Sequence, residues 1–177
     1  MKKMFVRSMF VMAVFILFAG SGVARAQGSD EGPWPLYVIT YGKGIILTSP
    51  DSETWTVRSS GTDVPLAALA YGKETFVAVG GRGTIVTGPR DGATWTERYS
   101  GTTEYLSAIT YGSERFVAVG AYGTIVTSPD SWNWTTVRSG SQSWLGSAVH
   151  AREKFIVVGT DGTILTSPDG TNWSPKL

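Results

Sequence analysis

A unit of about 40 residues repeats four times along this chain of 177 residues, and it constrains the fold more than any other feature. Its clearest markers are four tryptophans spaced 40, 39 and 39 residues apart: Trp55, Trp95, Trp134 and Trp173. Two apolar segments, of the types Phe-Val-Ala-Val-Gly and Gly-Thr-Ile-Val-Thr, keep the same period. A chain with such a period folds as an array of similar units, each of which packs on its neighbours.

Each repeat contains four short runs rich in Val, Ile, Thr, Phe and Tyr, bounded by Gly, Pro, Asp or Ser. This pattern predicts β-strands, and no window keeps a helical period beyond one turn. In the third repeat the strands are expected over residues 106–111, 115–119, 123–127 and 134–138, which we name positions A, B, C and D. Four antiparallel strands in about 40 residues make a propeller blade, so we predict an all-β chain, a β-propeller of about four blades.

The first blade is expected to be incomplete. Residues 36–42 match strand A of the later repeats, but read backward from Thr48 they fall where strand B belongs. Either way one strand is missing, which predicts fifteen strands in total. Two arrangements stay open: a small closed four-bladed ring, which we favour slightly, or an arc that pairs with a second copy as a homodimer completing a larger ring.

The aromatic and acidic residues that follow the period are interpreted as structural. The four tryptophans are expected to form a repeating contact between blades, because each indole can bury about 150–250 Å². Four residues before each of them stands an aspartate: Asp51, Asp91, Asp130 and Asp169. Such a carboxylate can accept backbone N–H groups and lock the hairpin between strands C and D. The alternatives are glycan stacking for the tryptophans and metal binding or catalysis for the aspartates.

Residues 1–26 have the layout of a cleaved secretory signal peptide. A basic start with Lys2, Lys3 and Arg7 precedes an apolar run over residues 9–19, and a small-residue cleavage site ends at Ala26, before Gln27. As a helix that run would span roughly 17 Å, short of the ~30 Å hydrocarbon core, so no stable membrane anchor is expected. We predict a periplasmic or secreted bacterial protein with a linker over 27–35 and the repeat domain over 36–177.

Composition excludes several classes of function. The chain has no Cys, which excludes disulfides, thiolate metal sites and a cysteine nucleophile. A single His leaves little room for His-based catalysis or metal binding, so no catalytic residue, metal or cofactor is predicted. Four of the 15 Lys/Arg and none of the 14 Asp/Glu lie in the predicted signal, which leaves a mature net charge of −3. That charge argues against a nucleic-acid partner.

A recognition face is expected at the end of the blades where the B–C and D–A loops meet. The B–C loops keep a Gly-x-x-Gly frame, but the residue before the last Gly varies, which indicates a side chain free of packing. Tyr and Trp at this end suit recognition, since they offer a large area at low entropic cost. The candidate binding residues are Lys43, Asp63, Arg82, Glu104, Tyr105, Tyr122, Trp144 and Asp161. The alternative is that these are ordinary solvated loop tips.

The segment Ser167-Pro168-Asp169-Gly170-Thr171-Asn172-Trp173 resembles the box S-x-D-x-G-x-T-W of the Asp-box, or BNR, repeat propellers, which are WD40/YVTN-like. It is one residue shorter between Asp and Trp. Together with the segments Phe-Val-Ala-Val-Gly and Gly-Thr-Ile-Val-Thr-Ser-Pro-Asp, it also resembles the photosystem II stability and assembly factor group. The resemblance covers about residues 36–177 and implies a propeller that assembles proteins, binds glycans or acts as a sialidase.

The sialidase branch of that superfamily uses an arginine triad around the central axis of six blades. The periodic arginines here, Arg58, Arg98 and Arg138, fall on the outermost strand D. We therefore predict a non-enzymatic, exported binding or assembly module with a protein partner. The alternative is a glycan-binding or sialidase-like glycoside hydrolase module, for which Asp63, Glu104 and Asp161 are the candidate carboxylates.

Overall fold

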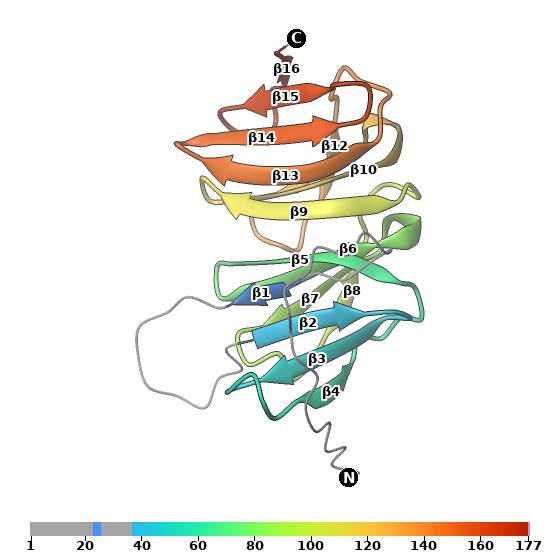
Figure 1. The fold of residues 1–177 in the computed structure, drawn as a ribbon, viewed down its shortest axis with the longest axis vertical. Helices are drawn as coiled ribbons and strands as arrows, with labels where there is room; N and C mark the ends of the chain where they lie inside the picture. Colours follow the sequence, from blue (N-terminus) through green and yellow to red (C-terminus); the bar gives the residue numbers. More distant parts are fainter. Residues whose placement is uncertain (1–22, 26–36, 177) are drawn as a thin grey trace.

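The computed structural model describes residues 23–25 and 37–176, which form sixteen β-strands in four antiparallel sheets of four strands each (Figure 1). Two single-turn 3-10 helices, which the sequence did not predict, complete the described secondary structure. The predicted fold class, an all-β propeller of four blades, is confirmed. The predicted signal peptide and linker lie outside the described residues, except for residues 23–25.

The four sheets follow one another in the sequence, and each has its strands in sequence order. Blade 1 contains β1 (Val23–Arg25), β2 (Tyr37–Tyr41), β3 (Ile45–Ser49) and β4 (Thr56–Ser59). Blade 2 contains β5 (Leu66–Gly72), β6 (Thr75–Gly80), η1 (Gly81–Gly83), β7 (Ile85–Pro89) and β8 (Thr96–Arg98). Blade 3 contains β9 (Leu106–Gly112), β10 (Arg115–Gly120), η2 (Ala121–Gly123), β11 (Ile125–Ser128) and β12 (Thr135–Val137). Blade 4 contains β13 (Leu145–Ala151), β14 (Lys154–Gly159), β15 (Ile164–Ser167) and β16 (Ser174–Pro175).

Blade 1 corrects the expected count of fifteen strands. β2 pairs with β3, with Ile39 opposite Leu47, so it takes position B, the second of the two readings. Strand A is supplied by β1, in which Val23 pairs opposite Ile39 and Arg25 opposite Tyr37. The count was one strand short because β1 lies inside the predicted signal peptide, which was set aside before the strands were counted.

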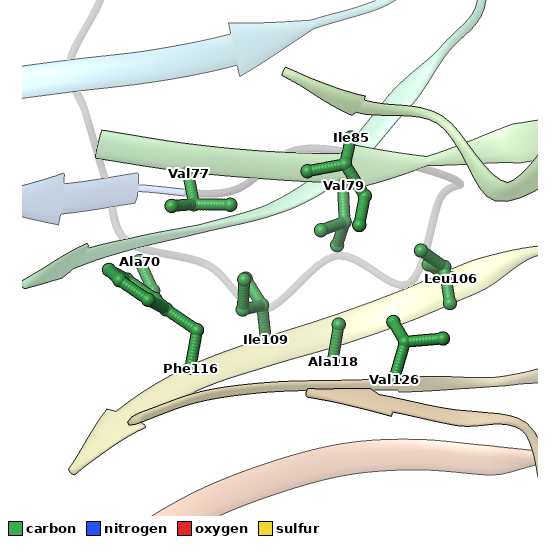
Figure 2. Close-up of a cluster of buried hydrophobic side chains, with 9 residues drawn as sticks. All are labelled: Ala70, Val77, Val79, Ile85, Leu106, Ile109, Phe116, Ala118 and Val126. Carbon is green, nitrogen blue, oxygen red and sulfur yellow. The ribbon is translucent and has the colours of Figure 1, made fainter. Parts of the chain in front are cut away.

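Buried apolar clusters fill the spaces between successive blades. Between blades 2 and 3, side chains from both sheets point toward one another (Figure 2). Those on the two central strands of each sheet, B and C, are completely buried. The residues from the central strands are Val77, Val79, Ile85, Phe116, Ala118 and Val126. Similar clusters lie between blades 1 and 2 and between blades 3 and 4. Because successive side chains of a strand point to opposite faces, the central strands of blades 2 and 3 each supply two interfaces.

The blades form an open series rather than a small closed ring. Blades 2 and 3 separate blade 1, at the bottom of Figure 1, from blade 4, at the top. The inner strands β5, β9 and β13 lie side by side along this series. The two outer faces are open to solvent: Val149 in blade 4 is 50% exposed, and Leu47 in blade 1 is half-buried where the equivalent Val126 of blade 3 is completely buried.

Candidate functional site

The B–C and D–A loops lie together at one end of the blades, which we call the loop end (residues 41–44, 60–66, 81–84, 99–106, 121–124, 139–145 and 160–163). In blades 2 to 4 a backbone hydrogen bond joins each B–C loop to the residue before strand A. The donor N–H and acceptor carbonyl pairs are Gly81 to Pro65 (3.1 Å), Ala121 to Tyr105 (2.9 Å) and Thr160 to Trp144 (2.8 Å). These bonds fix the loop tips relative to one another.

The variable residue of the B–C loop has a left-handed backbone in blades 2 to 4. Arg82, Tyr122 and Asp161 have φ of 54°, 52° and 55°, and all three side chains are exposed. A non-glycine residue in this conformation costs roughly 1 kcal/mol, so the fold holds these three side chains outward against a local strain. In blade 1 the loop differs, because Tyr41 replaces the first glycine and the N–H of Gly44 donates to the carbonyl of Gly42 at 2.8 Å.

An aromatic pair and a carboxylate meet at the loop end of blades 3 and 4. The rings of Tyr105 and Trp144 stack with centroids 5.4 Å apart and planes at 30°. Trp144 is 42% exposed, and burial raises the pKa of the Tyr105 hydroxyl. The carboxylate of Asp161 accepts the hydroxyls of Thr160 at 3.1 Å and Ser143 at 3.4 Å. The surface thus combines flat apolar rings with a fixed negative charge.

Three further exposed aromatic side chains lie at this same end, on blades 1, 2 and 3. Tyr41, Tyr99 and Tyr122 are 63%, 87% and 71% exposed. Among the described residues, the other exposed large aromatic besides Trp144 is Trp132, which lies in the C–D turn of blade 3 at the opposite end, beneath the guanidinium of Arg98. Sequence reasoning missed Tyr41 and Tyr99. Tyr41 was hidden because residues 36–42 also match strand A, which aligns it with Tyr111 of the third repeat, whereas the pairing of β2 with β3 places it at the start of the B–C loop.

The remaining candidates are spread along the loop end. Lys43, Asp63 and Arg82 are exposed on blades 1 and 2, and Glu104 is half-buried beside Tyr105 in the sequence. Within the described part of the chain, no hydrogen bond or ion pair joins Lys43, Asp63 or Arg82 to the stacked aromatic pair. The candidate charges therefore sum to +1 on blades 1 and 2 (Lys43, Asp63 and Arg82) and to −2 on blades 3 and 4 (Glu104 and Asp161).

The opposite end carries the C–D turns. In blades 1, 3 and 4 one carboxylate oxygen accepts the N–H groups of the second and third residues that follow, at 2.7–2.9 Å, and a preceding serine hydroxyl also donates to it. These aspartates are Asp51, Asp130 and Asp169. In blade 2, where Arg90 lengthens the turn and Gly88 replaces the serine, Asp91 accepts the N–H of Ala93 at 2.9 Å. The turns thus use the aspartates to hold the backbone.

The backbone N–H of Thr54, followed by that of Glu53, lowers the pKa of Asp51 to about 2 from 3.8. The N–H groups of Asn133 and Asn172 lower the pKa of Asp130 and Asp169 in the same way. A lowered folded-state pKa contributes stability above the unfolded value of about 3.9 that is lost as the pH falls through the folded value. We therefore expect the melting temperature to fall between about pH 4 and pH 2.

A variant carrying Asp51→Asn, Asp130→Asn and Asp169→Asn keeps one acceptor oxygen in each turn but loses the charges. Its melting temperature is expected to be lower than that of the wild type at neutral pH and to change less on acidification below pH 4. Thermal unfolding followed by circular dichroism across this range measures both. Parallel curves for the two proteins would contradict the assigned role of the carboxylates.

The periodic arginines lie away from the inner strands. The Nε groups of Arg58 and Arg98 donate to the hydroxyls of Thr48 and Thr87, at 3.1 and 2.9 Å, and so tie strand D to strand C of the same blade. Residues 23–25 and 37–176 contain no cluster of three or more His, Asp or Glu side chains able to hold a metal ion. No helix within those residues is long and apolar enough to cross a membrane.

No family profile matches the chain, and no curated protein matches it. Solved structures do. YCF48 from Cyanidioschyzon merolae is 15% identical with a TM-score of 0.63, and the match covers 87% of this chain and 54% of that one. A structure of YCF48 bound to D1 peptide is 13% identical with a TM-score of 0.63, and the match covers 90% and 57%. The chain thus spans a little over half the length of the YCF48 chains, and it shares with them the fold of a β-propeller.

Proposed function

We propose that this chain is a non-enzymatic assembly module that binds an extended segment of a protein partner at the loop end. The observation that carries the proposal is the stacked, partly exposed pair of Tyr105 and Trp144 at that end, together with the exposed Tyr41, Tyr99 and Tyr122 along it. The side chains of the Asp turns, by contrast, are engaged by their own backbone. The similarity to YCF48 bound to D1 peptide supports a protein partner, and so does the resemblance of the sequence to photosystem II assembly factors.

The charges of the loop end suggest the direction in which a segment lies on it. Exposed rings supply contact area at low entropic cost, and charged groups around them select the partner and its orientation. Lys43, Asp63 and Arg82 sum to a charge of +1 on blades 1 and 2 and would favour acidic side chains there, and Glu104 and Asp161 sum to −2 and would favour basic side chains toward blades 3 and 4. A segment with an acidic end and a basic end therefore fits this surface best.

A peptide library displayed on phage tests the proposal directly. Clones selected on the wild-type protein are expected to lose at least about 30-fold in affinity when Tyr122→Ala and Trp144→Ala are combined, since an aromatic hot spot contributes about 2 kcal/mol or more. Binding of the selected sequences as synthetic peptides, measured by calorimetry, gives the affinity. Unchanged affinity of the double variant would overturn the proposal.

Trp132→Ala is the matched control, because Trp132 is an exposed aromatic at the opposite end of the blades. Its affinity for the selected peptides is expected to equal that of the wild type. A loss with Trp132→Ala and none with the double variant would move the binding surface to the Asp turns.

We also propose that the chain is exported and loses residues 1–26. Removal of these residues would take β1 away and leave blade 1 with the three strands β2, β3 and β4. The intact mass of the protein recovered from the periplasm or the medium is expected to correspond to a chain that begins at Gln27. A mass that includes Val23 to Arg25 would contradict this proposal, since the exported protein would then retain the residues of β1.

A further inference from the structure

Blade 4 turns an apolar sheet face toward solvent. Val149 lies opposite Ile156 in the pair β13–β14, and Val158 lies opposite Ile164 in the pair β14–β15, so the four side chains share one face. Val149 and Val158 are 50% and 44% exposed, and the two isoleucines are half-buried. Side chains of this kind in one contiguous patch indicate an interaction surface.

The equivalent face is fully covered in the two preceding blades. The positions of Ile156, Val158 and Ile164 correspond to Val117, Val119 and Ile125 in blade 3 and to Val77, Val79 and Ile85 in blade 2. All six of these residues are completely buried. In each case the following blade covers them, with Phe155, Val157 and Leu165 against blade 3 and Phe116, Ala118 and Val126 against blade 2. The outer face of blade 4 is thus equivalent to the faces of blades 2 and 3 that blades 3 and 4 cover within the chain.

The covering face also occurs once more, on blade 1. There Ile39 and Leu47 lie opposite one another across β2 and β3, at the positions of Ala118 and Val126 of blade 3, which cover blade 2. Ile39 and Leu47 are half-buried, whereas Ala118 and Val126 are completely buried. Ser52 in the Asp turn of blade 1 is exposed, whereas Ser131, at the same position of blade 3, is only 1% exposed.

We propose that the outer face of blade 4 binds the outer face of blade 1 of a second copy of this chain. The contact joins the same two kinds of surface that already pack together between successive blades within one chain. Because the two faces differ, the association is head to tail, and two copies joined by two such contacts form a closed ring. That ring has eight blades, the upper end of the common range of about four to eight for propellers.

The molar mass of the full chain in solution, measured by light scattering after size-exclusion chromatography, tests this association. The wild type is expected to have the mass of two chains. Val158→Glu and Leu47→Glu, each of which places a charge in the contact at a position that the single chain leaves partly exposed, are expected to have the mass of one chain. Tyr99→Glu, at an 87% exposed position outside both faces, should keep the mass of two chains. Circular dichroism checks that each variant is folded, and Val149→Glu serves as a second variant of the blade 4 face.

Mixing the two single variants distinguishes this head-to-tail contact from a symmetric one. A Val158→Glu chain keeps its blade 1 face and a Leu47→Glu chain keeps its blade 4 face, so the mixture is expected to recover a species of two chains through one intact contact. A wild type of one chain at every concentration would overturn the proposal. So would a Leu47→Glu protein that still has the mass of two chains by itself, because a contact between two blade 4 faces would then explain the association.

Discussion

Replacement of Trp95 by alanine is expected to lower the free energy of unfolding by about 3–5 kcal/mol. Trp95 is 9% exposed and belongs to the cluster between blades 1 and 2, which also contains Val38 and Ile46 of blade 1. Its ring lies 6.2 Å from that of Phe76, and its Nε1 donates to the carbonyl of Gly92 at 3.1 Å. The substitution leaves a cavity between two sheets that cannot collapse without moving a whole blade. Chemical denaturation followed by circular dichroism measures the loss.

Trp55→Ala is the matched control. Trp55 occupies the same position of blade 1 and makes the same bond, from Nε1 to the carbonyl of Ser52 at 3.1 Å, but it is only half-buried. Its replacement is expected to cost about 1–2 kcal/mol, since less apolar area returns to water. The comparison is made in the Val158→Glu background, which is expected to keep the protein as single chains. Equal losses for the two variants there would show that the contact between blades 1 and 2 is not what Trp95 stabilises.

Gly123→Ala is expected to destabilise the protein by about 3 kcal/mol or more, because it breaks the link between the loops of blades 3 and 4. Gly123 has a φ of +69°, and a Cβ there would collide with the carbonyl oxygen of Ser141 and come within 2.8 Å of the hydroxyl of Ser139. The N–H of Gly123 donates to the carbonyl of Ser143 at 2.8 Å. Relief of the collision would move the backbone and break this bond.

Gly162→Ala separates the collision from the backbone conformation. Gly162 holds the same position in blade 4 with a φ of +70°, but a Cβ there would meet no described atom within 4 Å. Its replacement should cost only the left-handed conformation, about 1 kcal/mol. The difference between the two melting temperatures therefore measures the loop-to-loop contact, and equal temperatures would contradict it.

The repeat made most of the fold predictable. Strands of the third repeat begin and end within two residues of their predicted bounds, since a run such as Phe116 to Val119 is flanked by Gly and turn residues in blades 2 to 4. The contact between Phe116 and Trp134, with centroids 6.3 Å apart, recurs in blades 2 and 4 because both residues follow the period. Features that recur in one frame are the ones that packing requires.

Features that break the period could not be predicted. β1 was hidden because its residues also fit a signal peptide. The A–B hairpins of blades 2 to 4 turn through pairs of non-glycine residues with positive φ, such as Lys73 and Glu74 at 48° and 56°, where Asn-Gly is the usual signal. Of the candidate site, the loop frame was visible in the sequence. The stacking of Tyr105 on Trp144 was not, since it depends on how two successive blades are placed.

The most direct test of the account is hydrogen–deuterium exchange on the protein with and without the tightest-binding peptide from the phage library. Slower exchange is expected at the amides of residues 81–83, 121–123 and 141–144, which lie at the loop end, and unchanged exchange at the Asp turns. Protection confined to the Asp turns, or spread evenly over all four blades, would contradict the claim that this chain recognises a partner at one end of its blades.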